Sequence, residues 1–131
     1  MRTVIILRGL PGSGKSSIVK FFEPCGYVSM DLFWTRGSTE YKFDYTKLGE
    51  AVEWTHKQFT SLLDEFTHHT VVVDNISYKK EHFQFFLDEA KKRDCRIHIL
   101  HVERPLNELS SVHGVPFETI TRQAEQWERY L

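Results

Sequence analysis

The sequence of 131 residues has few cysteines and no long hydrophobic run. Its two cysteines, Cys25 and Cys95, form no C-x-x-C pair, so we expect reduced thiols, which are the default in a cytosolic protein. The longest apolar runs, residues 4–7 and 70–73, are far shorter than the ~18 residues that span a bilayer. The N-terminal stretch contains no small-residue cleavage site. We therefore expect a cytoplasmic protein with no membrane segment and no secretory signal.

The chain also has no excess charge of either sign. Lys and Arg number 17 and Asp and Glu 18, which gives a formal net charge of −1. This balance argues against a protein whose main role is to coat nucleic acid, because such proteins carry a strong basic excess, although a small nucleic-acid contact stays open. Hydrophobic residues make up 40% of the sequence and charged residues 27%, which is typical of one globular domain over residues 1–131.

Short apolar runs alternate with amphipathic stretches along the chain. This alternation predicts parallel β-α-β units, and hence an α/β protein with a three-layer sandwich built on a four-stranded, mostly parallel sheet. The expected strands are residues 3–7, 27–30, 70–73 and 96–102, and the expected helices are residues 16–22, residues 45–66, a stretch after Ser77, and residues 116–131.

Three of these helices carry start signals. Asp44 is expected to cap the helix at 45–66, and Phe43 and Leu48 stand at the positions of a hydrophobic staple. Ser77 is expected to cap the next helix, and Pro116 to occupy the first turn of the last one. The residues expected to face the core are Leu48, Ala51, Val52, Phe59, Leu62, Leu63 and Phe66 in the first, Phe83, Phe86, Leu87 and Ala90 in the second, and Phe117, Ile120, Ala124, Trp127 and Leu131 in the last.

The strongest motif is a glycine-rich loop between the first strand and the first helix. Its backbone N–H groups are expected to cradle phosphate oxygens, with Lys15 on the β- and γ-phosphates and the Ser16 hydroxyl on Mg²⁺. The alternative is an ordinary glycine-rich turn, but all four fixed positions and both flanking elements match, which favours nucleotide binding. The loop reads Gly9-Leu10-Pro11-Gly12-Ser13-Gly14-Lys15-Ser16 and matches G-x-x-x-x-G-K-[ST] in full.

Two carboxylates end predicted strands. Asp74 follows Val71–Val73, where a carboxylate can reach Mg²⁺ beside the phosphate loop; the alternative is a turn formed with Asn75. Asp31 ends the second strand, at the sheet edge where open α/β sheets bind ligands. It can accept the proton of an attacking hydroxyl as a general base, or it can simply cap the short helix that follows.

Other candidates have weaker signals. Arg36, Arg104 and Arg122 lie in or near segments that can close over a nucleotide, but each also fits an exposed surface position. His113 precedes the last helix and fits a pocket or a turn equally well. The other histidines show no spacing typical of a zinc site. Packing is the first interpretation of Trp34, Trp54 and Trp127, and base stacking is the second.

Several stretches together resemble one protein group. They are Arg8–Ser17, Ser29-Met30-Asp31, a Y-x-F-D stretch at residues 41–44 followed by Leu48, Ala51 and Trp54, the strand end Val71-Val72-Val73-Asp74-Asn75, and His113-Gly114-Val115-Pro116 followed by Ile120, Arg122 and Trp127. These stretches span nearly the whole chain. They resemble the small P-loop kinases related to the kinase domain of phage polynucleotide 5′-kinase and to the NEDD4-binding protein 2-like ATP-binding family.

The resemblance implies a P-loop kinase fold that binds ATP and Mg²⁺ and transfers the γ-phosphoryl group to a hydroxyl. In polynucleotide kinases that hydroxyl is the 5′ end of a nucleic acid; a nucleoside or nucleotide is also open as acceptor. Lys15 and Asp31 are then the catalytic residues, and Ser16 and Asp74 the metal ligands. The expected nucleotide-binding residues are Gly9, Pro11, Gly12, Ser13, Gly14, Lys15, Ser16, Ser17 and Arg122.

The chain departs from this group at two places. Polynucleotide kinases carry an arginine three residues after the catalytic acid, where this chain has Trp34, with Arg36 two residues further on. The Arg-Asn pair that usually precedes H-G-V-P is replaced by Ser110 and Ser111. Both changes remove positive charge. Two other functions therefore stay open: a nucleotide-dependent binding or regulatory module with weak or no transfer, and a kinase for a small metabolite.

Overall fold

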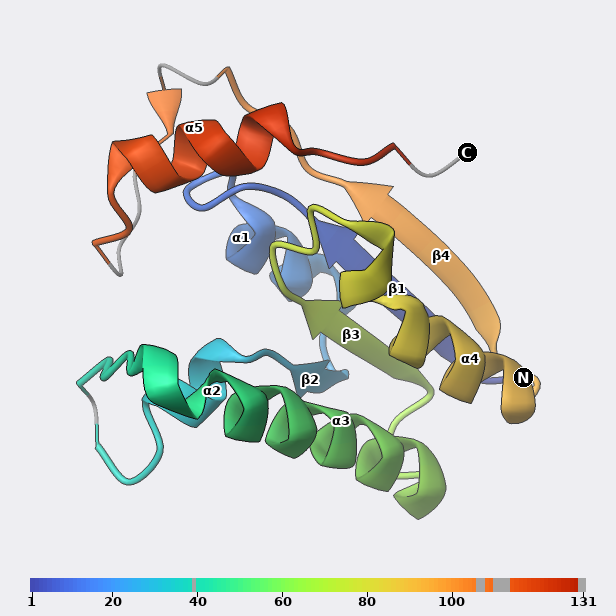
Figure 1. The fold of residues 1–131 in the computed structure, drawn as a ribbon. Helices are drawn as coiled ribbons and strands as arrows, with labels where there is room; N and C mark the ends of the chain where they lie inside the picture. The colour runs from blue at the N-terminus through green and yellow to red at the C-terminus, as the bar shows by residue number, and fades with distance from the viewer. Residues whose placement is uncertain (39, 106–107, 110–113, 130–131) are drawn as a thin grey trace.

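Four parallel strands form the sheet of this protein (Figure 1). A computed structural model describes residues 1–38, 40–105, 108–109 and 114–129. Its strands are β1 (Thr3–Arg8), β2 (Gly26–Val28), β3 (Thr70–Asp74) and β4 (Arg96–His101), in the order β2-β3-β1-β4. Because every pairing is parallel, the carboxyl ends of all four strands meet at one edge of the sheet.

Helices cover both faces of the sheet, which confirms the predicted α/β three-layer arrangement. Figure 1 shows α3 and α4 on one face, α1 on the other, and α5 across the carboxyl ends of the strands. The helical elements are α1 (Lys15–Val19), η1 (Lys20–Phe22), α2 (Asp31–Trp34), η2 (Tyr45–Lys47), α3 (Leu48–Glu65), η3 (Lys80–His82), α4 (Gln84–Lys92) and α5 (Phe117–Glu125).

The larger hydrophobic core lies between the sheet and helices α3 and α4. β1 and β3 consist of Val and Ile runs buried on both faces, which is typical of central strands of a parallel sheet. The inward residues predicted for the helix after Ser77 are all buried, three of them in α4 and Phe83 at its N-cap. On the opposite face a smaller cluster forms between α1 and the sheet, from Ile5, Leu7, Val19 and Val72. The sheet is thus thinly covered on the side of α1.

Helix α3 buries a narrower stripe than the sequence predicts. Its buried residues are Ala51, Thr55, Phe59 and Leu63, at steps of four, so the expectation that Leu48, Val52 and Phe66 face the core is wrong. A step of four keeps residues on one face of a helix, and the Thr55 hydroxyl is satisfied there by donating to the Ala51 carbonyl at 2.7 Å. Asp44 caps the entrance as predicted, but it caps η2, accepting from Thr46 N–H at 3.0 Å, and α3 follows.

The predicted capping role of Ser77 is wrong. Ser77 is buried with φ +51°, and α4 begins only at Gln84, after the 3₁₀ turn η3. The reason lies in the sheet edge: the chain first crosses the end of β1, where Gly9 N–H donates to the Ile76 carbonyl and Arg8 Nε donates to the Ser77 carbonyl at 2.7 Å. Ser77 is therefore placed by its backbone rather than by its hydroxyl.

The C-terminal helix is shorter than predicted. Pro116 is its N-cap and not its first helical residue, and α5 ends at Glu125. Ile120 is buried as expected, whereas Phe117 is 55% exposed, so its inward assignment is wrong. Trp127 lies after the helix and stacks on His101 of β4 at 4.4 Å between ring centroids. Leu131 is outside the described residues.

Two smaller boundaries also differ. The helix predicted at 16–22 is divided into α1 and η1, and β2 ends at Val28, so Asp31 stands three residues beyond the strand. No helix among the described residues is long and apolar enough to cross a membrane.

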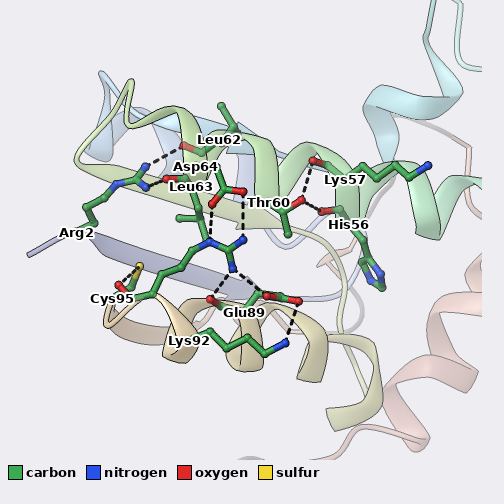
Figure 2. A network of polar contacts seen from close by, with 11 residues as sticks. Arg2, His56, Lys57, Thr60, Leu62, Leu63, Asp64, Glu89, Lys92 and Cys95 are labelled. Carbon is green, nitrogen blue, oxygen red and sulfur yellow. Dashed lines mark hydrogen bonds and ion pairs between the residues drawn. The ribbon is translucent and has the colours of Figure 1, made fainter.

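Arginines tie α3 to its neighbours at the amino end of the sheet (Figure 2). Arg2 donates to the Leu62, Leu63 and His68 carbonyls, so it satisfies the open carbonyl groups at the end of α3. Arg93 bridges α3 and α4, with Nε 2.8 Å from Asp64 Oδ1 and Nη1 2.8 Å from Glu89 Oε2. These contacts hold the edge opposite the carboxyl ends of the strands.

Candidate functional site

The phosphate loop connects β1 to α1 at the carboxyl edge of the sheet. Gly14 has φ +99°, in the left-handed region that favours glycine. Gly9 is required for a different reason: a Cβ built there would lie 2.5 Å from Ser13 Oγ and 2.8 Å from the Val102 carbonyl oxygen. The loop therefore packs against its own serine and against the chain that leaves β4.

Lys15 points back along this loop. Its Nζ donates to the Gly9 carbonyl at 2.8 Å and is 3.5 Å from the Leu10 carbonyl. Burial lowers the pKa of Lys15, and the negative charges of Asp74 and Asp31 partly offset this effect. The structure thus brings the loop lysine within electrostatic reach of both carboxylates that the sequence singles out.

Asp74 lies at the end of β3, paired in register with Leu7 of β1, and is buried. Its Oδ2 accepts from Ser16 Oγ at 3.2 Å and from the Tyr27 hydroxyl at 2.6 Å. Burial raises the pKa of Tyr27, as does the charge of Asp74 and the hydrogen bond to it, so this hydroxyl remains a donor. Asp74 is therefore part of the loop's polar network and not a simple turn residue.

Asp31 is exposed at the same edge of the sheet, in the first turn of α2. It does not cap α2, because Met30 occupies the N-cap position. The turn is fixed by two hydrogen bonds: Met30 N–H donates to Asn75 Oδ1 at 2.9 Å, and Asp31 N–H donates to Ser29 Oγ at 3.2 Å. Asn75, which follows Asp74, thus positions the backbone of Met30 next to Asp31.

A cavity of about 240 Å³ lies between the phosphate loop, the end of β4 and α5. Arg104 and Arg129 contribute to its wall, while Arg122 is exposed on α5 and is not among the lining residues. The cavity is thus lined by basic residues from two segments, one of which sequence reasoning did not single out, together with the acidic Glu103 and with His101. The apolar and small residues of its wall are Leu10, Ser13, Val102, Leu109, Ala124 and Trp127.

The remaining candidates are placed as follows. Arg36 is exposed, and its guanidinium lies 3.9 Å from the Phe33 ring centroid. Trp34 is buried, and its ring lies 4.9 Å from that of Phe43, so packing accounts for it; Trp54 lies in the same aromatic cluster. His113, Ser110 and Ser111 are outside the described residues.

Arg8, which directly precedes the loop motif, has a structural role that the sequence did not indicate. Its guanidinium is buried between the Phe83 and Trp127 rings, 4.7 Å and 4.6 Å from their centroids. It donates to the carbonyls of Ser77 at 2.7 Å and Glu128 at 2.6 Å, and burial lowers its pKa. Arg8 therefore connects the start of the phosphate loop to the segment after α5.

Sequence reasoning also missed Tyr27 as the hydrogen-bond partner of Asp74, and it missed the electrostatic effect of Asp31 on Tyr41. Burial raises the pKa of Tyr27 and of Tyr41, and the negative charges of Asp74 and of Asp31, respectively, raise it further. For Tyr27 the available signal was only its place in a predicted strand, because the pairing of that strand with the Asp74 strand is known from the structure alone. For Tyr41 it was the Y-x-F-D pattern, which carried a resemblance but no role.

The oxygens of Ser16 and Asp74 fit Mg²⁺, which prefers hard oxygen ligands and takes few of them from the protein. Within the described part of the chain, no three His, Cys, Asp or Glu side chains gather as they would around an ion held by protein ligands alone. A site with one carboxylate and one hydroxyl suits an ion that is shared with phosphate oxygens.

The comparisons with known proteins support the same fold. No family model matches the chain. Human NEDD4-binding protein 2 is 28% identical over 140 residues, an alignment that covers 98% of this chain and 8% of that protein. The chain therefore spans less than a tenth of this relative's length.

Solved structures also align with this chain over most of its length. A chain of the Pnkp1/Rnl/Hen1 RNA repair complex matches with a TM-score of 0.73 and 17% identity, over 95% of this chain and 43% of that one. The Mycobacterium tuberculosis APS kinase CysC, in complex with AMPPNP and APS, matches with a TM-score of 0.57 and 22% identity, over 82% and 65% of the two chains. The chain thus has the fold of the P-loop kinases, and its sequence resembles NEDD4-binding protein 2 along nearly its whole length.

Proposed function

We propose that this protein is an ATP-dependent kinase that transfers the γ-phosphoryl group to a hydroxyl of a nucleic-acid 5′ end, a nucleoside or a nucleotide. The observation that carries the proposal is the contact at 3.2 Å between Ser16 Oγ, which follows Lys15 in the glycine-rich loop, and Asp74 Oδ2 at the end of β3. Phosphoryl transfer needs a loop for the phosphates, a metal site and a base, and these residues together with Asp31 supply all three.

The proposed reaction uses the exposed carboxylate of Asp31 as the base. Asp31 accepts the proton of the acceptor hydroxyl, and the hydroxyl oxygen forms a bond to the γ-phosphorus. The bond from that phosphorus to the β–γ bridging oxygen breaks, and ADP leaves with the electron pair. Lys15, released from the Gly9 carbonyl, stabilises the negative charge on the β- and γ-phosphates.

Ser16 and Asp74 are the residues proposed to hold Mg²⁺, whose charge neutralises the phosphate oxygens when it is bound. Because Ser16 already touches Asp74, little movement is needed to turn both oxygens toward one ion. The cavity of about 240 Å³ beside Leu10 and Ser13 is the proposed place of the nucleoside. A larger cavity of about 630 Å³, between α1 and β2, adjoins Ser16 but not the rest of the loop, so we do not place the nucleoside there.

The experiment is γ-phosphoryl transfer from labelled ATP with Mg²⁺ to a panel of 5′-hydroxyl DNA and RNA oligonucleotides, nucleosides and nucleoside monophosphates. Lys15→Ala is expected to abolish turnover, and Asp31→Asn to reduce transfer by ~10² or more with nearly unchanged ATP affinity. The matched control is Asp94→Asn, since Asp94 is exposed in the turn after α4. Unchanged transfer in Asp31→Asn would show that Asp31 is not the base.

One observation favours a second function, a nucleotide-dependent binding module with weak or no transfer. Trp34, which stands where polynucleotide kinases have an arginine, is only 6% exposed and packs inside an aromatic cluster. That position therefore offers no positive charge to an acceptor phosphate. Tight ATP binding without labelled product on any acceptor of the panel would support this function over the kinase.

A further inference from the structure

Tyr27 reaches Asp74 from the neighbouring strand because the two side chains lie on the same face of the sheet. Tyr27 of β2 pairs in register with Val72 of β3, and Asp74 stands two residues beyond Val72. Side chains two residues apart in a strand share a face, so Val72 and Asp74 both point to the side of α1. The Tyr27 ring packs there against the small cluster that contains Val72, and its hydroxyl donates to Asp74 Oδ2 at 2.6 Å. The register of β2 against β3 thus sets this contact.

Two donors from different elements meet on one oxygen of Asp74. Ser16 Oγ of α1 donates to Oδ2 at 3.2 Å, and the Tyr27 hydroxyl of β2 donates to the same atom. An ionised carboxylate has only acceptor atoms, so both hydroxyls give their protons to it. The Ser16 oxygen keeps its lone pairs, and among the described residues no hydrogen bond reaches Asp74 Oδ1. The carboxylate is therefore fixed through Oδ2, while Ser16 Oγ and Asp74 Oδ1 stay open to a cation that prefers oxygen ligands.

From this arrangement we infer that Tyr27 is a positioning residue for the metal site, which holds the Asp74 carboxylate in the orientation that lets Ser16 and Asp74 share Mg²⁺. The inference rests on the proposed function, because it assigns Tyr27 a role toward the proposed metal ligands. Ser16 alone does not fix this orientation, since a carboxylate held by one hydrogen bond can still turn about it. Lys15 acts on Asp74 through its charge, while its Nζ donates to the Gly9 carbonyl. The second hydrogen bond, from Tyr27, is therefore the contact that stops the rotation.

The first test measures metal binding and requires no acceptor. The affinity for AMPPNP is measured by calorimetry in EDTA and at increasing free Mg²⁺, which gives the Mg²⁺ concentration for half of the metal-dependent gain. Tyr27→Phe keeps the ring and removes only the hydroxyl. It is expected to raise this concentration about tenfold, because partners that hydrogen-bond to a metal-binding carboxylate tune the affinity for the metal. The affinity in EDTA is expected to stay that of the wild type. Tyr45→Phe is the matched control, since Tyr45 is 77% exposed, and it is expected to behave as the wild type.

The second test combines Tyr27→Phe with Asp74→Asn. In the Asp74→Asn background, Tyr27→Phe is expected to cause no further rise in the Mg²⁺ requirement, because the carboxylate that it positions is already absent. In the transfer assay, Tyr27→Phe alone is expected to lose about tenfold in rate at limiting Mg²⁺ and to regain most of it in excess Mg²⁺. A purely structural role for Tyr27 would weaken AMPPNP binding equally in EDTA and in Mg²⁺, and excess Mg²⁺ would not restore transfer.

The two tests separate this inference from the proposed function. A Mg²⁺ requirement that is the same in Tyr27→Phe and wild type, or that rises equally in Tyr45→Phe, overturns the role of Tyr27 and leaves the kinase standing. An AMPPNP affinity that does not respond to Mg²⁺ in the wild type overturns both the role of Tyr27 and the metal site. Absence of transfer to every acceptor overturns the kinase alone, and a raised Mg²⁺ requirement for AMPPNP binding in Tyr27→Phe still supports the role of Tyr27 in that case.

Discussion

At the scale of single residues, the phosphate loop depends on the absence of one side chain. The space at Gly9 is closed by Ser13 Oγ, which is buried, and by the Val102 carbonyl oxygen, which belongs to backbone. Neither can move away at low cost, in contrast to the end of a long flexible side chain. Gly9 therefore determines how closely the loop approaches the end of β4.

Gly9→Ala is expected to destabilise the fold by more than ~2 kcal/mol and to weaken ATP binding, because the added methyl group forces the loop away from β4. Gly49→Ala is the matched control. Gly49 lies in the first turn of α3 with open space around its Cβ position, so alanine there is expected to stabilise the protein by about 0.5–1 kcal/mol. Urea unfolding and ATP titration measure both effects.

Three histidines that lose part of their hydration on folding predict how stability depends on pH. Partial desolvation lowers the pKa of the half-buried His56 in the folded protein, and it lowers the pKa of the more exposed His82 and His101 in the same direction. The unfolded chain then binds more protons below its ordinary histidine pKa of about 6.5, so stability is greatest above that pH and is lost as the pH falls toward the lowered values. The free energy of unfolding is expected to decrease between about pH 7.5 and 5.

His56 provides the specific test of this dependence. Its ring stacks on Phe85 at 3.8 Å between centroids, an arrangement that a phenylalanine can also adopt. His56→Phe is expected to make the loss of stability on acidification shallower and to have its smallest effect near pH 8, where histidine is neutral. The free energy of unfolding is measured at several pH values for both proteins. An equal decrease on acidification in the wild type and in His56→Phe would contradict the assignment.

At the scale of elements, α3 is held by a stripe of four residues rather than by its whole apolar surface. Phe59→Ala is expected to cost about 3–5 kcal/mol, because Phe59 is fully buried and its ring packs edge-on against Phe86 of α4 at 5.0 Å. Phe21→Ala is the control, since Phe21 is 82% exposed, and it is expected to leave the midpoint of urea unfolding nearly unchanged.

Elements far apart in the sequence are joined by Arg8. Arg8→Met is expected to leave the Ser77 and Glu128 carbonyls without their donor and to loosen the segment after α5, at a cost of about 2–4 kcal/mol. Limited proteolysis is expected to cut this segment faster in the variant. Lys57→Met, a change in an exposed pair on α3, serves as the control and is expected to show the cleavage rate of the wild type.

How far the sequence predicted these elements depended on the range of the interactions involved. Local signals sufficed for the strands, for the loop that ends at Ser16 and for the Asp44 cap, since strand runs, turns and caps are set by neighbouring residues. Ser77 was misassigned because its conformation is set by Arg8, 69 residues away. The tyrosine partner of Asp74 lies 47 residues from it, and no periodicity encodes such a contact.

At the scale of the whole molecule, the single domain proposed for residues 1–131 predicts one cooperative unfolding transition. Thermal unfolding followed by far-UV circular dichroism and by tryptophan fluorescence is expected to give coincident curves. ATP with Mg²⁺ at about 100 times its Kd is expected to add about 2.7 kcal/mol of stability to the wild type and little to Lys15→Ala. Equal stabilisation of both proteins would contradict nucleotide binding at the loop.

The order of the strands has a consequence for how the chain folds as it is synthesised. β1 lies between β3 and β4, and Thr3 pairs with Thr70 and Arg96, so both neighbours of this central strand are made long after it. Until then β1 has no partner, and closing such long loops makes the sheet slow to form. The pairing of β3 with β1 forms the centre of the sheet, and the same pairing brings Asp74 to the phosphate loop. A nascent chain is therefore expected to acquire ATP affinity only after β3 has left the ribosome, and not when the phosphate loop itself emerges.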